Sequence, residues 1–163
     1  MQEQGRALAW RLPARLATRL AHLWFLLARP MTLGVRGLVI DERGRALLVK
    51  HGYVPGWHLP GGGVEVGETF EAALARELAE EGNIVITGVP ALHGMFFNSR
   101  ISRRDHVALY IVREFRLDGA PVPNHEIVEH GFFALDALPA DTTRATRARI
   151  AEVFSGATVS ELW

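Results

Sequence analysis

The chain contains no cysteine, and this absence excludes several kinds of protein at once. Without thiols there is no disulfide framework, no thiolate zinc site and no cysteine nucleophile. The formal net charge is zero at pH 7, so no overall field draws the chain to nucleic acid, and we expect no DNA partner. At 163 residues the chain is long enough for one domain with a hydrophobic core. A reducing, cytoplasmic location is consistent with this composition.

Long hydrophobic runs are also lacking, because the longest, residues 23–28, is too short to span a bilayer. Residues 1–30 nevertheless differ from the rest, with five arginines, one acidic residue and leucines at helical spacing. We predict an amphipathic helical segment over residues 1–30 and one domain over residues 31–163. The leucine stripe favours packing on a domain, and membrane contact through residues 1–30 is the less favoured alternative.

Strand-like and helix-like segments alternate through the remaining chain. The expected strands cover residues 32–40, 46–50, 57–59, 84–89, 92–97, 106–117 and 131–135. The first two are expected to form a hairpin around the turn at residues 41–44. Thr69 is a good N-cap for one helix, and Asp141 is expected to cap a second helix over residues 143–154. Strands with helices before and after them suggest an α/β fold, an α/β/α sandwich with a mixed sheet.

The densest pattern lies at residues 61–84, reading GGGVEVGETFEAALARELAEEGNI. A glycine-rich turn leads into a helix on which Glu77, Glu80 and Glu81 share one side, because positions three and four apart face the same way. Three like charges repel one another unless water or a cation neutralises them. Mg2+ and Mn2+ prefer such oxygen ligands. Taken alone, the three glutamates are more typical of a solvated helix face.

The spacing of the neighbouring residues favours the cation. Gly62 is followed after five residues by Glu68, and seven residues later by Arg76-Glu77 and the two remaining glutamates. This spacing resembles the signature of the Nudix hydrolases, G-x5-E-x7-R-E-U-x-E-E-x-G-U, in which U is apolar.

The last glycine of that signature is Asn83 here, with Gly82 just before it. A helix of this kind ends in a left-handed residue, normally glycine and sometimes asparagine. We expect Asn83 to end the helix, or Gly82 to end it one residue earlier.

The resemblance implies a Nudix-type sandwich over about residues 32–155, and it implies a hydrolase. The implied metal ligands for Mg2+, with Mn2+ as a second choice, are Gly61 through its carbonyl, Glu77, Glu80 and Glu81. Glu68 and Arg76 are implied to pair and to hold the turn and helix in register.

The base that activates water is implied to lie either in the signature helix or on a later loop. Residues 123–130 resemble the acidic loop that precedes an aromatic residue and an LDxLP segment in many Nudix sequences. Glu126 is the first choice there, as metal ligand or base, and Glu129 the second, against the alternative of a solvated loop. The expected catalytic residues are Glu77, Glu81 and Glu126.

Other candidates are single residues or small clusters that also have ordinary structural explanations. Arg36 on the first strand and His58 before the glycine turn are candidates for substrate phosphate contact. The basic cluster at residues 100–104 is expected to be a solvated loop, with phosphate or RNA 5′-end contact as the alternative. Three aromatic residues are expected to be core or pocket wall: Trp57, Phe96 and Phe97.

The function expected from these residues is magnesium-dependent hydrolysis of a phosphoanhydride bond in a nucleoside diphosphate linked to another moiety. NTP pyrophosphohydrolysis is the alternative within the enzyme class. A non-catalytic module that senses a nucleotide or a protein is the other, although such modules tend to lose the helix glutamates. The expected partner is a nucleotide-type small molecule, and a homodimer is left open.

Overall fold

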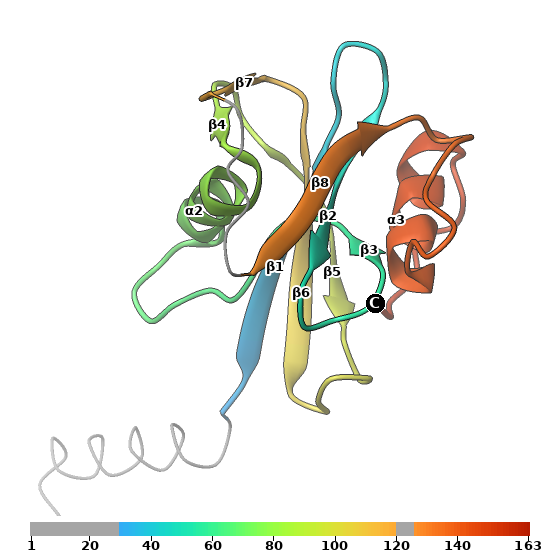
Figure 1. Ribbon diagram of the computed structural model, residues 1–163. Coiled ribbons are helices and arrows are strands. Elements are labelled where there is room, and N and C mark those ends of the chain that lie inside the picture. Colours follow the sequence, from blue (N-terminus) through green and yellow to red (C-terminus); the bar gives the residue numbers. More distant parts are fainter. Residues whose placement is uncertain (1–29, 120–125) are drawn as a thin grey trace, which may run out of the picture. The chain divides into compact units, whose positions relative to one another are not determined.

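The computed structural model describes residues 30–119 and 126–163 (Figure 1). The helical segment predicted over residues 1–30 therefore lies, except for Pro30, outside the described residues. In chain order the described elements are β1 (Thr32–Val39), β2 (Ala46–His51), β3 (Trp57–His58), α2 (Phe70–Gly82), β4 (Ile84–Ile86), β5 (Ala91–Phe97), β6 (Asp105–Val112), β7 (Phe115–Leu117), β8 (Ile127–Phe133) and α3 (Arg144–Phe154). In this part of the chain, no helix is long and apolar enough to cross a membrane.

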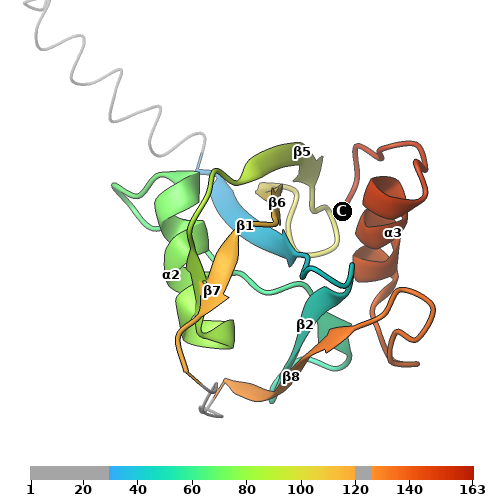
Figure 2. The same cartoon turned by 90° about the horizontal axis from the view of Figure 1, so that it is seen from above.

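Parallel and antiparallel strand pairs lie between the two helices. One sheet has the order β1-β6-β5, with β1 parallel to β6 and β5 antiparallel to it. A second sheet has the antiparallel order β3-β2-β8, and β4 pairs with β7. Both views place α2 on one side of the strands and α3 on the other (Figures 1 and 2). The expected α/β class with a mixed sheet is confirmed.

Two hydrophobic cores lie on the two sides of β1. Val35 and Val39 belong to the core that contains the α2 leucines, whereas Leu38 and Ile40 belong to the core that contains Ile150 of α3. Both faces of the end of β1 are buried, so Leu38, Val39 and Ile40 form a continuous hydrophobic run. Gly37 precedes that run, and a Cβ there would lie only 3.1 Å from the leucine side chains of α2.

The predicted β1–β2 hairpin is wrong. Asp41 does form the expected turn, since its Oδ1 accepts from the backbone N–H groups of Arg43 and Arg45. After a single bridge between Ile40 and Ala46, however, the strands diverge into different sheets. β1 pairs with β6 along its whole length, and β2 pairs with β3 and β8. Strands that are buried on both faces carry no alternation that would identify their neighbours.

Several strand boundaries also differ from prediction. The single strand expected over residues 106–117 is two strands, because the chain leaves β6 after Val112 and crosses to β4. The Glu114 carbonyl accepts from the N–H groups of Thr87 and Gly88 at that crossing. β4 ends at Ile86, and β8 begins at residue 127, so much of the expected acidic loop is a strand.

The ends of the two helices test the predicted capping residues. Thr69 caps α2 as expected, with its side chain accepting from the Ala72 N–H. Asn83 ends α2 in the left-handed conformation at φ 50° and ψ 35°, and its N–H donates to the carbonyl of residue 79. Asp141 does not cap α3, because Thr143 accepts from the Thr146 N–H instead.

Candidate active site

The glycine turn lies directly against β1 and the end of α2. The Gly61 N–H donates to Glu81 Oε2 at 2.7 Å. Gly61 has φ +135°, and a Cβ on it would collide with the carbonyl of Val35. The Gly62 carbonyl accepts from the Val35 N–H at 2.9 Å. Glycine is therefore required for the backbone to approach both the strand and the carboxylate.

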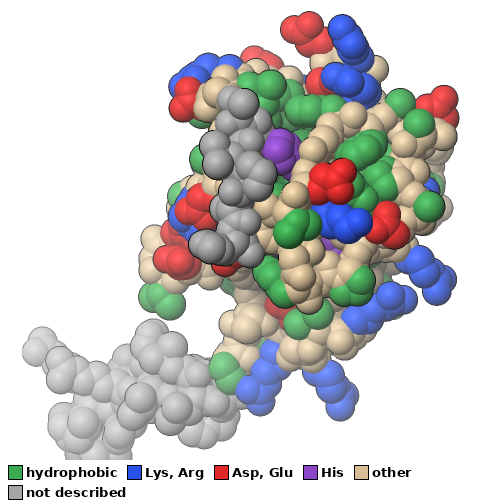
Figure 3. Space-filling model, in the orientation of Figure 1, with side chains coloured by type: hydrophobic (Ala, Val, Ile, Leu, Met, Phe, Trp, Pro, Cys, Tyr) green, Lys and Arg blue, Asp and Glu red, His purple; other side chains and the backbone are tan. Residues whose placement is uncertain are grey.

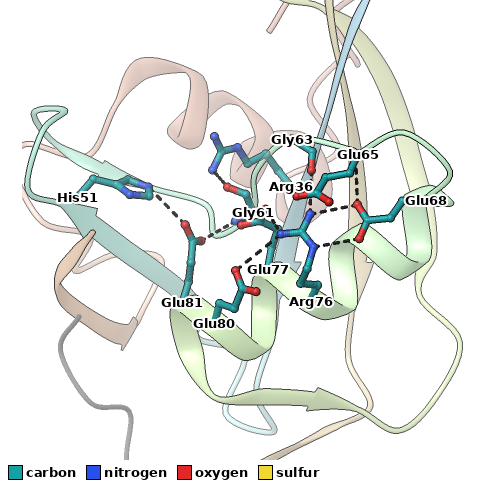
Figure 4. A network of polar contacts seen from close by, with 10 residues as sticks. All are labelled: Arg36, His51, Gly61, Gly63, Glu65, Glu68, Arg76, Glu77, Glu80 and Glu81. Atoms are coloured by element: carbon teal, nitrogen blue, oxygen red, sulfur yellow. Dashed lines mark hydrogen bonds and ion pairs between the residues drawn. The ribbon is translucent and has the colours of Figure 1, made fainter. Parts of the chain in front are cut away.

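Arg76 joins this turn to α2 (Figure 4). Its Nε and Nη2 donate to the two Glu68 oxygens at 2.9 and 3.1 Å, and Nη2 also donates to the Gly63 carbonyl at 3.1 Å. Nη1 donates to Glu77 Oε1 at 2.7 Å. These carboxylates raise the pKa of Arg76, and the guanidinium lowers the pKa of Glu68. The structure thus contains the expected Glu68–Arg76 pair, which holds the turn in register with the helix.

The three α2 glutamates expected to bind metal, Glu77, Glu80 and Glu81, differ in burial. The side chains of Glu77 and Glu81 are 14% and 7% exposed, and both line a cleft of about 500 Å³. The Glu80 side chain is 59% exposed and lies 3.7 Å from Arg76 Nη1. Among the described residues, no group of three acidic, histidine or cysteine side chains stands close enough, as it lies, to hold a metal ion.

Glu81 and His51 both line the cleft with strongly shifted pKa values. Burial raises the pKa of Glu81 to about 7, the Gly61 N–H and Arg36 oppose that rise, and Glu77 and Glu126 add to it. His51 Nε2 lies 3.8 Å from Glu81 Oε1. Burial lowers the pKa of His51 to about 4, with Arg36 and His58 contributing. At pH 7 His51 is therefore neutral, and the two side chains do not form an ion pair.

This donor set suits a hard divalent cation. Arg36 Nη1 donates to the Gly61 carbonyl and, at 3.3 Å, to the Leu59 carbonyl. A cationic group thus already lies at the oxygen expected to bind metal. The raised pKa of Glu81 shows that its negative charge is poorly compensated. Carboxylate and carbonyl oxygens around such a charge are the ligands that Mg2+ and Mn2+ prefer.

The cleft brings together most of the predicted residues, but not all. It is lined by Arg36, Gly61, Glu77, Glu81 and Glu126, among others. Glu126 is exposed at its position just before β8. Glu129 pairs with Lys50 in the β2–β8 register and does not line the cleft.

His58 lines a neighbouring lobe of about 290 Å³ rather than the cleft itself. Its Nε2 lies 3.1 Å from the Pro55 carbonyl, and burial lowers its pKa. The lobe and the cleft share six lining residues: Arg36, His51, Tyr53, Asn98, Ile101 and Trp163. The lobe is therefore continuous with the cleft.

Some residues of the site carry no signal in the sequence. His51 and Tyr53 lie shortly before the glycine turn in the chain, and Trp163 lies far after it. They have no characteristic spacing, and only the packing of β2 and of the segment after α3 brings them to the cleft.

The other candidates are divided between surface and core. The arginines at 100, 103 and 104 are exposed on the β5–β6 loop, and basic side chains gather along the lower edge of the face in Figure 3. Of these three, only Arg100 lines the lobe. Trp57 and Phe96 are buried in the core on the α3 side, and Phe97 is half-buried beside His106.

Comparison with known proteins identifies the family. The family model described as the NUDIX domain matches residues 30–154. The chain belongs to the Nudix family. This match covers most of the chain, and hydrolases of this family generally use a divalent metal.

Several curated proteins are similar to part of this chain. The Nudix chain is 33% identical over 104 residues to an ADP-ribose pyrophosphatase of Methanocaldococcus jannaschii, covering 62% of this chain and 61% of that one. It is 30% identical over 105 residues to an oxidized purine nucleoside triphosphate hydrolase of Danio rerio, covering 63% and 66%. The curated relatives are matched over only 34% to 66% of their own length.

The fold is similar to that of solved Nudix structures. The crystal structure of a MutT NUDIX hydrolase from Burkholderia pseudomallei superposes with a TM-score of 0.64 and 29% identity. The match covers 75% of this chain and 97% of that one.

Proposed function

We propose that this Nudix hydrolase cleaves a phosphoanhydride bond in a nucleoside diphosphate linked to another moiety, with Mg2+ as cofactor and Mn2+ as a substitute. The observation that carries the proposal is the cleft itself. Carboxylates from α2, a carboxylate near β8 and the backbone of the glycine turn all line the same 500 Å³ space. The similarity to an ADP-ribose pyrophosphatase supports this substrate class.

The residues that would hold the cation are Glu77, Glu80, Glu81 and the Gly61 carbonyl. When bound, the cation would neutralise phosphate charge and lower the pKa of a water ligand. Glu81 and Glu77 already line the cleft, and Glu81 is oriented by the Gly61 N–H. Glu80 is the exposed member of the set, so it is the side chain that must turn inward.

The remaining residues of the cleft act on water and phosphate. Glu126 accepts the proton of the attacking water or completes the carboxylate set, and its charge already reaches Glu81 across the cleft. Arg36 contributes a positive charge at the glycine turn, where an anionic diphosphate would lie. His58 contacts the substrate from the neighbouring lobe.

NTP pyrophosphohydrolysis is the second candidate, favoured by the similarity to an oxidized purine nucleoside triphosphate hydrolase. The two activities release different products. A nucleoside diphosphate linked to a group X yields a nucleoside monophosphate and X-phosphate, whereas an NTP yields a nucleoside monophosphate and pyrophosphate.

A substrate screen with product identification tests the proposal. Nucleotide sugars, dinucleotides, NTPs and capped RNA are incubated with Mg2+, Mn2+, Ca2+ or excess EDTA, and phosphate is measured after a phosphatase step. We expect activity with Mg2+ and Mn2+, poor activity with Ca2+ because of its looser coordination, and none in EDTA. Full activity in excess EDTA would overturn the proposal.

A further inference from the structure

The segment that follows α3 returns to the cleft along the edge of β5. The Phe97 N–H donates to the Glu161 carbonyl at 2.9 Å, and the Trp163 N–H donates to the Phe97 carbonyl at 3.1 Å. A parallel bridge joins Phe97 and Leu162. The segment is thus attached to the sheet by backbone hydrogen bonds on both sides of Leu162.

A buried ion pair on α3 holds the same segment from the other side. Arg149 is 2% exposed, and its Nη2 donates to Glu152 Oε1. Its Nη1 donates to the Leu162 carbonyl at 2.8 Å, and Glu152 Oε1 accepts from the Ser160 N–H at 2.9 Å. A buried pair of this kind often adds no stability over apolar residues, so its value here lies in fixing the segment.

The anchored segment sets the orientation of the Trp163 ring. The ring lies edge-on to buried Phe96, with centroids 5.7 Å apart and planes at 70°. The Arg149 guanidinium lies 4.1 Å from the Phe96 centroid and 5.8 Å from the Trp163 centroid. Trp163 packs against the core but stays partly exposed, and it lines both the cleft and the lobe.

The lobe next to the cleft has the character of a site for a flat, apolar group. Tyr53 is 69% exposed and Ile101 is 77% exposed, and both line it together with Val54 and Trp163. Arg36 lies at the boundary, because it lines both the lobe and the carboxylate cleft. A substrate with its phosphates in the cleft would therefore place the adjoining group among aromatic and aliphatic side chains.

We infer that Trp163 is a specificity residue that contacts the aromatic base of a nucleotide in this lobe, and that Arg149 and Glu152 position it. The inference deepens the proposed function and rests on it, since it states which part of the substrate fills the lobe. A base presents a π-face to an aromatic side chain, whereas a bare ribose phosphate has no such face.

Equilibrium titration separates contact with the base from contact with the phosphate. Each of three proteins is titrated separately: the wild type, Trp163→Ala and Trp163→Phe. The ligands are the 5′-monophosphates of adenosine, guanosine, cytidine and uridine, with ribose 5-phosphate as the ligand that lacks a base. We expect Trp163→Ala to weaken binding of the preferred nucleotide about tenfold and to leave ribose 5-phosphate within about twofold. Trp163→Phe should retain most of the affinity, because it keeps an aromatic face.

Leu162→Ala is the matched control, since it keeps the backbone carbonyl that Arg149 binds and its side chain lines neither the cleft nor the lobe. It should bind every ligand as the wild type does. Equal losses for nucleotide and ribose 5-phosphate in Trp163→Ala would show a purely structural role. No loss for either, or a wild type that prefers no nucleotide over ribose 5-phosphate, would also overturn the inference.

Kinetics with the best substrate test the positioning residues. Glu152→Gln should raise KM for the substrate with a base, leave kcat within about twofold, and leave hydrolysis of the base-free analogue unchanged. A parallel loss on both substrates, or no change in KM, would contradict positioning. Failure of the proposed function would look different: the wild type would hydrolyse no phosphoanhydride, whatever the titrations show.

Discussion

The two helices each bury one glutamate, and the two glutamates have opposite surroundings. Glu81 of α2 and Glu152 of α3 are both 7% exposed. Glu152 Oε1 accepts hydrogen bonds from Arg149 Nη2 and the Ser160 N–H, and His93 Nε2 lies 3.1 Å from Glu152 Oε2. Glu81 accepts a hydrogen bond from the Gly61 N–H and lies beside neutral His51. Within the described residues, no arginine forms an ion pair with Glu81.

This difference separates scaffold from binding site. A buried carboxylate that is fully paired contributes order to its surroundings, as Glu152 does for the segment after α3. A buried carboxylate with an uncompensated charge, facing a cleft, is poised for a ligand. Burial alone does not distinguish the two helices, whereas the partners of each carboxylate do.

Activity should show the largest contrast between the two glutamates. Glu81→Gln should lower kcat by at least about a hundredfold, because it removes a charge from the cation site without changing shape. Glu152→Gln should lower kcat by less than about threefold. Steady-state assays with the best substrate measure both, and a fall of less than threefold for Glu81→Gln would show that Glu81 does not hold the cation.

Stability should show the reverse contrast. Glu152→Ala should lower the free energy of unfolding by about 3 kcal/mol, because it leaves Arg149 buried without its carboxylate. Glu81→Ala should cost less in the metal-free protein, since the lost charge was itself unfavourable. Denaturant unfolding in EDTA measures the free energy of unfolding of both variants. Equal losses of that free energy would contradict the distinction between the two glutamates.

The pH dependence of stability should isolate Glu81. Its pKa is raised from 4.5 to about 7 in the folded protein. The protonated carboxyl is therefore favoured by folding, and the stability it contributes is complete below pH 4.5 and lost as pH rises through 7. Metal-free wild type should lose about 3 kcal/mol relative to Glu81→Gln between pH 4.5 and 8.

Unfolding curves of the two proteins at both pH values measure this loss. Glu152→Gln, compared in the same way, is the control for general pH effects. A difference between wild type and Glu81→Gln that stays constant with pH would show that Glu81 titrates normally.

The smallest effect is expected at the end of α2. Asn83→Gly should change the free energy of unfolding by less than about 1 kcal/mol, because glycine accepts the left-handed conformation readily. Asn83→Ala should be the more destabilising of the two, since alanine tolerates that conformation poorly. Thermal melts compare both variants with the wild type. A loss of more than about 1 kcal/mol for Asn83→Gly would show that the asparagine side chain makes a hydrogen bond that the helix end requires.

The features that could be predicted from the sequence are local ones. The Thr69 cap and a left-handed helix end at Asn83 or Gly82 were expected from nearby residues, and the Glu68–Arg76 pair was implied by the resemblance to the Nudix signature. The Thr143 cap was missed although it is equally local, because Asp141 is also a favourable capping residue and lies only two positions earlier.

The features that could not be predicted depend on long-range packing. β1 and β2 are buried on both faces, so their hydrophobicity does not state which strands they pair with. His51 on β2 and Trp163 after α3 both reach the cleft, but they have no spacing that relates them to the signature. The difference between Glu81 and Glu152 depends in part on tertiary partners, because Glu152 also contacts Ser160 and His93, although its ion-pair partner Arg149 lies on the same helix.

Binding of Mn2+ tests the central claim most directly, because it requires neither substrate nor turnover. Free Mn2+ is followed by electron paramagnetic resonance during titration of wild type, Glu81→Gln and Glu152→Gln. The account predicts one site in the wild type, an affinity at least about tenfold weaker in Glu81→Gln, and wild-type affinity in Glu152→Gln. Equal Mn2+ affinity in all three proteins would contradict it.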